Sequence, residues 1–139
     1  MKTLKYMMLT LVLATMTTTA EAKLVCKDHM YMFGLAASFV DSTLYLTDIQ
    51  DVVGAWYDTK DKALMGRDSY SFQLKEYMAD KMGQTNRVCL VIFATTLKKA
   101  EKKYMKLKKK YMLKDGTIPG MRYLTAADFK FEAVDVSDK

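Results

Sequence analysis

The chain has 139 residues, half of them hydrophobic, and carries a formal net charge of +6. Nine of its lysines lie between Lys98 and Lys114, so the positive charge is local, which argues against a protein that wraps nucleic acid over its whole surface. The length allows one domain with one modest hydrophobic core, which excludes a chain of several large domains.

The first 22 residues predict a secretory signal peptide. Residues 1–5 carry two lysines, residues 7–16 are apolar apart from threonines, and residues 20–22 form a small-x-small cleavage signal. The apolar run is too short to span a bilayer, which takes about 20 residues. We therefore expect export to the periplasm or the cell surface, and a single small domain over residues 23–139 without a transmembrane segment.

Two strands joined by a turn are predicted next. Aromatic residues alternate along residues 30–39, and residues 43–50 have the composition of a return strand. Asp41 and Ser42 between them have the chemistry of a tight turn. Residues 51–68 show no regular pattern, and we expect an irregular segment there.

A helix is predicted to begin around residues 68–71 and to run to Met82. Asp68 and Ser71 offer a cap at its start, and Gly83 ends it. Residues 87–94 then have the pattern of a buried strand that is apolar on both faces, and we expect this strand at the centre of a sheet.

A lysine-rich helix over residues 97–112 is the most informative feature. One stripe of apolar residues recurs at alternating spacings of three and four, as on one side of an α-helix: Leu97, Ala100, Tyr104, Leu107 and Tyr111. The opposite side carries six lysines, which we call the lysine face: Lys98, Lys99, Lys102, Lys106, Lys109 and Lys110. Like charges four residues apart each destabilise the helix by about 0.2–0.5 kcal/mol, so its apolar stripe needs a tertiary partner. Thr95 or Thr96 can cap it.

The lysine face has two interpretations. It can be a solvated surface that keeps the protein soluble. It can also be a docking surface for an anionic partner, such as an acidic protein, a lipid headgroup, an anionic polysaccharide or nucleic acid. The sequence leaves both interpretations open.

Turn residues at Asp115-Gly116 and Pro119-Gly120 break the chain after this helix, and residues 129–133 alternate as a final strand. The predicted order is therefore β-β-α-β-α-β. We predict an α+β fold, a two-layer sandwich of about four strands with both helices on one face.

Two cysteines, Cys26 and Cys89, follow the signal peptide. In an oxidising compartment such a pair is first interpreted as a disulfide, which would tie down the N-terminal part of the domain. The alternative is two unpaired thiols, one of them a small buried hydrophobe. Cys26 and His29 are separated by two residues, a spacing that is common for metal ligands. Without a second pair of ligands the support for a zinc site is weak, and we expect no cofactor.

Several short stretches resemble small exported bacterial proteins of unassigned function. They are GLAASF (34–39), DST (41–43), TDIQ (47–50), AW (55–56), RDSYS (67–71), AEKKY (100–104), LKKKY (107–111) and AADFKF (126–131). The resemblance implies a bacterial, extracytoplasmic, single-domain protein. It carries no catalytic or binding residues to transfer.

No catalytic constellation emerges from the sequence. His29 is the only histidine, and no serine or cysteine nucleophile stands in a known local pattern with it. The six glycines are dispersed rather than gathered in a phosphate-binding loop. The aspartates of residues 48–61 lie in turn-like sequence, where they ordinarily bend the backbone. We therefore expect a non-catalytic protein rather than an enzyme.

Two classes of function remain. The first is an interaction or accessory module that docks on a larger protein or assembly of the cell envelope, with Trp56 and Tyr57 as candidate contact residues on an exposed segment. The second is a binder of an anionic polymer or envelope surface through the lysine face, without specific nucleic acid recognition. Pairing of the lysines with the acids of residues 48–61 would favour the first class, whereas an unpaired face keeps the second open. An unrecognised hydrolase is the third and weakest class.

Overall fold

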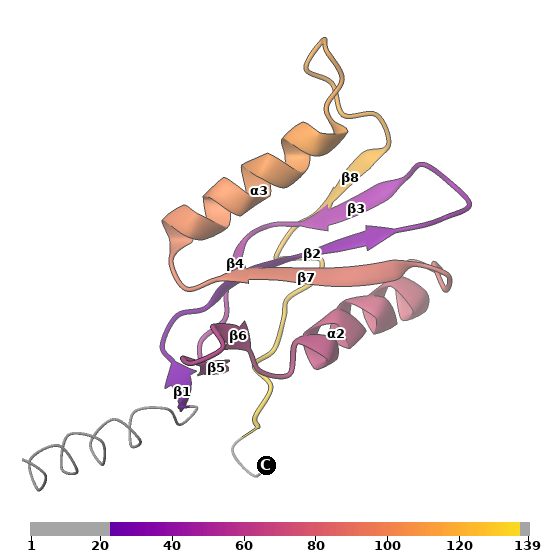
Figure 1. Cartoon of the computed structure of the whole chain (residues 1–139). Coiled ribbons are helices and arrows are strands. Elements are labelled where there is room, and N and C mark those ends of the chain that lie inside the picture. Colours follow the sequence, from indigo (N-terminus) through magenta and orange to yellow (C-terminus); the bar gives the residue numbers. More distant parts are fainter. Residues whose placement is uncertain (1–22, 137–139) are drawn as a thin grey trace, which may run out of the picture.

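The computed structural model describes residues 23–136, which form two helices and eight strands in two sheets (Figure 1). The larger sheet contains β2 (Tyr31–Ala37), β3 (Leu44–Thr47), β4 (Gln50–Asp51), β7 (Val88–Ala94) and β8 (Met121–Leu124). Its strands lie in the order β7-β2-β3-β8, with β4 beside β2 where β3 ends. Neighbouring strands are antiparallel except β3 and β8, which are parallel. The predicted α+β class is confirmed, and the first five predicted elements follow in the order β-β-α-β-α, whereas the last strand lies at Met121–Leu124 rather than at residues 129–133.

A β-bulge separates β3 from β4. Leu35 pairs with Leu46 and Met32 with Gln50, so three steps along β2 match four steps along its partner. The buried Thr47 lies at the extra residue, where its hydroxyl accepts a hydrogen bond from the Gly34 N–H at 2.8 Å. This side chain replaces the backbone partner that the bulge removes.

The two helices cover opposite faces of the larger sheet (Figure 1). α2 (Arg67–Asp80) packs in the same hydrophobic cluster as Met32, whereas α3 (Leu97–Tyr111) packs in the cluster of Phe33. These two residues are neighbours in β2, and successive side chains of a strand point to opposite faces. Both are fully buried, so β2 is covered on both sides.

The prediction that both helices share one face is wrong for a topological reason. β3, β7 and β8 run in the same direction, so α2 and α3 lie on crossover connections between parallel strands. The first connection crosses the sheet from β3 to β7, and the second crosses back from β7 to β8. Crossovers are right-handed in nearly all proteins, and two of one hand that run in opposite directions place their helices on opposite faces.

The strand predicted to be central is also misplaced, because β2 holds the centre and β7 forms one edge. β7 is apolar on both faces because it lies between two helices, one above and one below the sheet. The apolar pattern of this strand therefore correctly indicated packing on both faces of the sheet, but it did not indicate how many strands pair with β7.

A smaller antiparallel sheet occupies much of the segment predicted to be irregular. It has the order β1 (Leu24–Lys27), β5 (Ala55–Asp58) and β6 (Ala63–Leu64). The buried Asp58 carboxylate accepts hydrogen bonds from the backbone N–H groups of Lys60 and Asp61 at 2.9 and 3.2 Å, which closes the turn after β5. The predicted signal peptide lies outside the described residues.

The C-terminal segment 129–136 completes the core without forming the predicted strand. Phe129, Phe131 and Val136 are buried, and the first two belong to the cluster under α2. Side chains take the place of a neighbouring strand: Gln50 bonds the carbonyl of Phe129 and the N–H of Phe131, both at 2.8 Å. The fourth principal strand is instead β8, which the sequence pattern did not reveal.

Candidate functional site

α3 begins and packs as its sequence predicts. The hydroxyl of Thr96 accepts a hydrogen bond from the Lys99 N–H at 3.3 Å and caps the helix. Ala100 is fully buried, and the half-buried Tyr104 meets the ring of Phe33 edge-on, with centroids 5.1 Å apart. Leu97 is the exception within the apolar stripe, because 46% of it is exposed.

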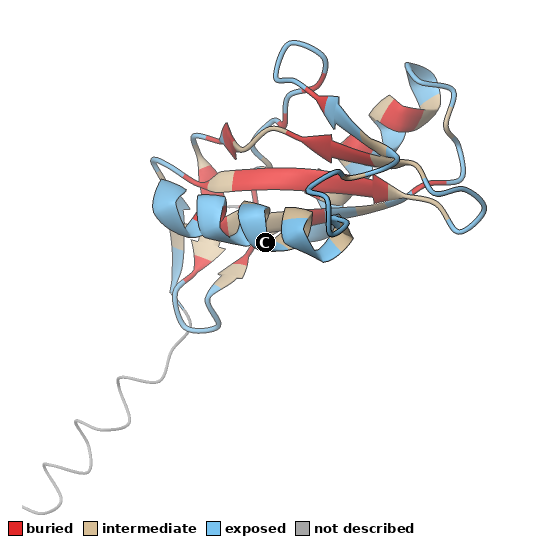
Figure 2. Ribbon diagram, turned by 90° about the horizontal axis from the view of Figure 1, so that it is seen from above, coloured by how far each residue is buried: buried red, intermediate tan, exposed pale blue. Residues whose placement is uncertain are grey.

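The lysine face is open to solvent along the whole helix (Figure 2). Its six members are all exposed: Lys98, Lys99, Lys102, Lys106, Lys109 and Lys110. Two ion pairs, His29–Asp51 and Arg87–Asp41, lie outside α3, and within the described chain no acid of residues 48–61 pairs with a lysine of this helix. The acids of residues 48–61 therefore do not neutralise the face, which leaves its charge available to an external anion.

An open hollow borders part of the lysine face. Lys99, Lys102, Lys103 and Lys106 line a cavity of about 230 Å³ between their side chains. Lys99, Lys102 and Lys106 belong to the lysine face, and their positive charge favours an anion such as phosphate, sulfate or carboxylate over an uncharged ligand.

Two other lysines of α3 have partners within the protein. The Lys103 ammonium donates a hydrogen bond to the Phe93 carbonyl at 2.7 Å and lies 5.3 Å from the centre of the Phe93 ring. The Lys108 ammonium lies 5.6 Å from the ring centre of Tyr104 and 5.2 Å from that of Tyr123. These cation–π contacts separate structural lysines from the six that face solvent only.

Burial raises the pKa of Tyr104 from its usual 10 to about 12. The unfolded chain loses its phenolic proton first, so the stability linked to this group is present below pH 10 and is lost as the pH rises from about 10 to about 12. We expect the free energy of unfolding of wild type to fall more steeply across this range than that of Tyr104→Phe. Chemical denaturation at several pH values measures the difference, and equal slopes would contradict the burial of this phenol.

Trp56 and Tyr57 lie in β5 and are half-buried rather than fully exposed. Tyr57 packs against the main hydrophobic cluster, and the Lys27 ammonium lies 5.5 Å from its ring centre. Trp56 pairs with Cys26 across β1 and β5. Both aromatic residues therefore contribute to the smaller sheet, which reduces the area that they offer to a partner.

The structure does not pair Cys26 with Cys89, against the expected disulfide, and both thiols are free. Cys26 is exposed on β1 of the smaller sheet, whereas Cys89 lies on β7 of the larger one. Burial raises the pKa of the Cys89 thiol, so this group stays protonated at neutral pH. The disulfide argument relied on compartment and cysteine count, which carry no information about which sheet each strand joins.

Metal binding and catalysis gain no support from the described residues. The Nδ1 atom of His29 lies 2.7 Å from a carboxylate oxygen of Asp51 in an exposed pair. Within residues 23–136, no three side chains among histidine, cysteine, aspartate and glutamate gather as a metal site would require. What the site offers chemically is the positive charge of its exposed lysines.

The sequence analysis missed residues along the open edge of β7. Arg67 at the start of α2 donates a hydrogen bond from Nε to the Val91 carbonyl at 2.8 Å, and Lys103 reaches the same strand from the opposite face of the sheet. Leu90 on this strand is 53% exposed, and Phe39 in the turn after β2 is 93% exposed. Only the unusual exposure of apolar residues marks this surface, and sequence alone does not give exposure.

No protein-family model, curated protein or solved structure matches this chain. The resemblance to small exported bacterial proteins therefore stays a prediction. No helix in the described part of the chain is long and apolar enough to cross a membrane.

Proposed function

We propose that this protein is a non-catalytic binding protein that docks on an anionic polymer or surface of the cell envelope through the lysine face of α3. The single observation that carries the proposal is that six exposed lysines share one side of α3 while no acid of residues 48–61 forms an ion pair with them. The predicted signal peptide supports a location outside the cytoplasm, where anionic lipids and polysaccharides are the abundant partners.

Charge reversal on the lysine face tests the proposal. The variant replaces Lys99, Lys102, Lys106 and Lys110 with glutamate. Each lysine near an anionic surface contributes about 1 kcal/mol, so we expect the affinity for anionic vesicles and for a polyanion matrix to fall at least a hundredfold, or about 3 kcal/mol. Binding of wild type should also weaken steeply as salt is raised, because salt screens these contacts.

A matched control separates the lysine face from net charge. Lys23, Lys60, Lys81 and Lys130 are exposed and lie outside α3, so their replacement with glutamate produces the same change in net charge. This control should keep most of the binding of wild type. Equal loss in both variants would show that only total charge matters, and unchanged retention of the α3 variant would refute the proposal.

A second candidate function is an accessory module that docks on a protein of the cell envelope. The observation that favours it is the exposure of apolar side chains at one turn, where Phe39 is 93% and Val40 is 88% exposed. Purification of the tagged protein from its native envelope, with crosslinking and at physiological salt, should then recover a defined partner. Replacement of Phe39 and Val40 with serine should lower that recovery, and equal recovery would count against this function.

A further inference from the structure

β7 has an open edge, and the backbone groups that point outward from it can be identified. Within residues 23–136 it pairs with β2 alone. The carbonyls of Val91 and Phe93 point away from β2, because they accept hydrogen bonds from the Arg67 and Lys103 side chains. Outward groups alternate along an antiparallel strand, so Cys89 also presents its backbone N–H and C=O outward. Such a row of groups is what an added strand would pair with.

Two cavities flank this edge, one on each face of the sheet. The first, of about 280 Å³, lies beside α2 and is lined in part by Phe72, Lys75 and Cys89. The second, of about 260 Å³, lies beside α3 and is lined in part by Ile92 and Lys106. Side chains of a strand point alternately to the two faces, so a strand added to β7 would direct successive side chains into the two cavities.

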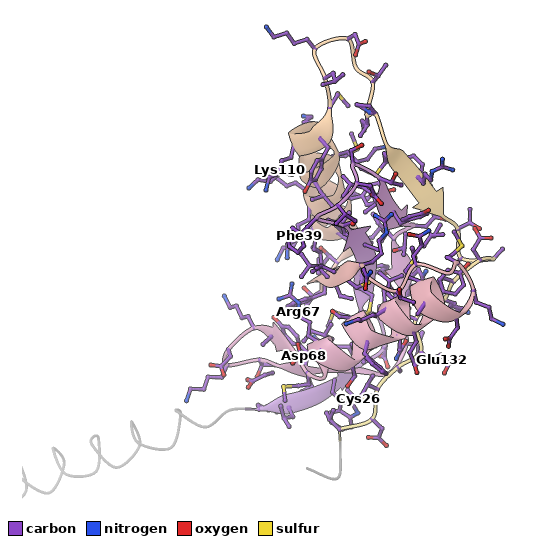
Figure 3. All side chains as sticks on the ribbon, turned by 90° about the vertical axis from the view of Figure 1, so that its right-hand side faces the viewer. Cys26, Phe39, Arg67, Asp68, Lys110 and Glu132 are labelled. Carbon is purple, nitrogen blue, oxygen red and sulfur yellow. The ribbon has the colours of Figure 1, made fainter. Side chains whose placement is uncertain are left out.

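Apolar side chains surround the open part of the edge. Leu90 pairs with Leu35, which places it on the α3 face, and 53% of it is exposed. Phe72 of α2 is 57% exposed on the other face. In Figure 3, Phe39 of the turn after β2, Arg67 at the start of α2 and Lys110 near the end of α3 are on the same side of the view. A partner segment with apolar side chains on both faces would cover this surface.

Charge selects the chemistry of the partner. Five cations from the two helices lie along the edge or line its cavities: Arg67 and Lys75 from α2, and Lys103, Lys106 and Lys110 from α3. Asp68 is the acid among the residues that line the two cavities. A second copy would bring the same cations against themselves, which opposes self-pairing. An incoming strand that bonds the Val91 and Phe93 carbonyls would release Arg67 and Lys103 to bind carboxylates.

We propose that the edge of β7 is the docking site for an extended, acidic segment of a partner protein, which adds a strand to the larger sheet. This inference goes beyond the lysine face, since it concerns backbone pairing at the edge of β7, although Lys106 and Lys110 border both surfaces. Backbone hydrogen bonds supply the affinity, and the two cavities accept alternate side chains of the partner strand and so give specificity.

A test peptide of about six residues, the usual length of a strand, rich in valine and threonine and with glutamates at its ends, measures this binding. We expect it to shift the amide NMR signals of Cys89 and Val91 in the full-length protein. The same peptide with N-methylated alternate amides should bind at least about tenfold more weakly, because it has lost backbone donors. A peptide with lysines in place of the glutamates should bind more weakly still.

Two variants separate this site from the lysine face. Cys89→Pro removes an outward-facing N–H and no bond to β2, so it should weaken the acidic peptide at least about tenfold and leave retention on the anionic matrix unchanged. Replacement of Lys98, Lys102 and Lys109 with glutamate should do the reverse. The N-methylated peptide decides the question if Cys89→Pro does not fold. Three results would each overturn the inference. They are equal binding of the acidic peptide and its N-methylated form, NMR signal shifts confined to the outer side of α3, and dimers of the protein in place of a peptide complex.

Discussion

Replacing Gln50 with leucine is expected to lower the free energy of unfolding by about 2–6 kcal/mol. Only 6% of Gln50 is exposed, and its amide bonds both the carbonyl of Phe129 and the N–H of Phe131. Leucine fills similar space but leaves two buried backbone groups without partners, and each such group costs about 1–3 kcal/mol. A loss of this size is a large share of the stability of a small domain, which is about 5–15 kcal/mol.

The chain supplies a matched control for this prediction. Gln73 also bonds one backbone C=O and one backbone N–H, both of Glu132 and both at 2.9 Å, but near solvent. Water replaces these bonds in Gln73→Leu, so we expect a loss of about 1 kcal/mol or less. Denaturation by urea measures both variants. Equal losses at the two positions would mean that burial does not set the value of the Gln50 bonds.

Simultaneous replacement of Arg67 and Lys103 with alanine is expected to make the protein self-associate. These side chains cover the outward carbonyls of Val91 and Phe93 and place two charges on an otherwise apolar edge. Their removal leaves an uncovered edge, which natural sheets generally protect with charge. Two copies of β7 can then pair, and each hydrogen bond contributes about 1 kcal/mol, so association should tighten at least about tenfold.

Sedimentation velocity over a range of concentrations measures this association. Lys98→Ala with Lys102→Ala removes the same charge from the lysine face and leaves the edge covered, so this control should sediment as wild type does. If the edge variant stays as monomeric as the control at every concentration, the two cations do not protect β7. Association of both variants would instead trace the effect to lower net charge.

The local features of the fold could be predicted from the sequence. The apolar stripe and Thr96 are enough to define α3, because helical spacing and capping depend on residues a few positions apart. The same holds for α2, although the structure begins it at Arg67 without a side-chain cap. The first five elements, in the order β-β-α-β-α, could be predicted for a similar reason, whereas the last strand was placed at residues 129–133 and lies at Met121–Leu124.

The features that depend on distant partners could not be predicted. β5 pairs with the distant β1 as well as with its neighbour β6, and residues 129–136 are held by side chains from residues far earlier in the chain. The two candidate surfaces differ in the same respect, because one depends on local sequence and the other on distant partners. The lysine face follows from the period of one helix, whereas the edge of β7 is defined by Arg67, Lys103 and the absence of a second neighbouring strand in the described part of the chain.

The burial of residues 129–136 has a consequence for the order of events in the cell. Phe129 and Phe131 close the core beneath α2, and Gln50 cannot satisfy its amide until they arrive. A ribosome that has made α2 and β7 has therefore not yet made the groups that complete their packing. The core beneath α2 therefore closes only after residues 129–131 have left the ribosome.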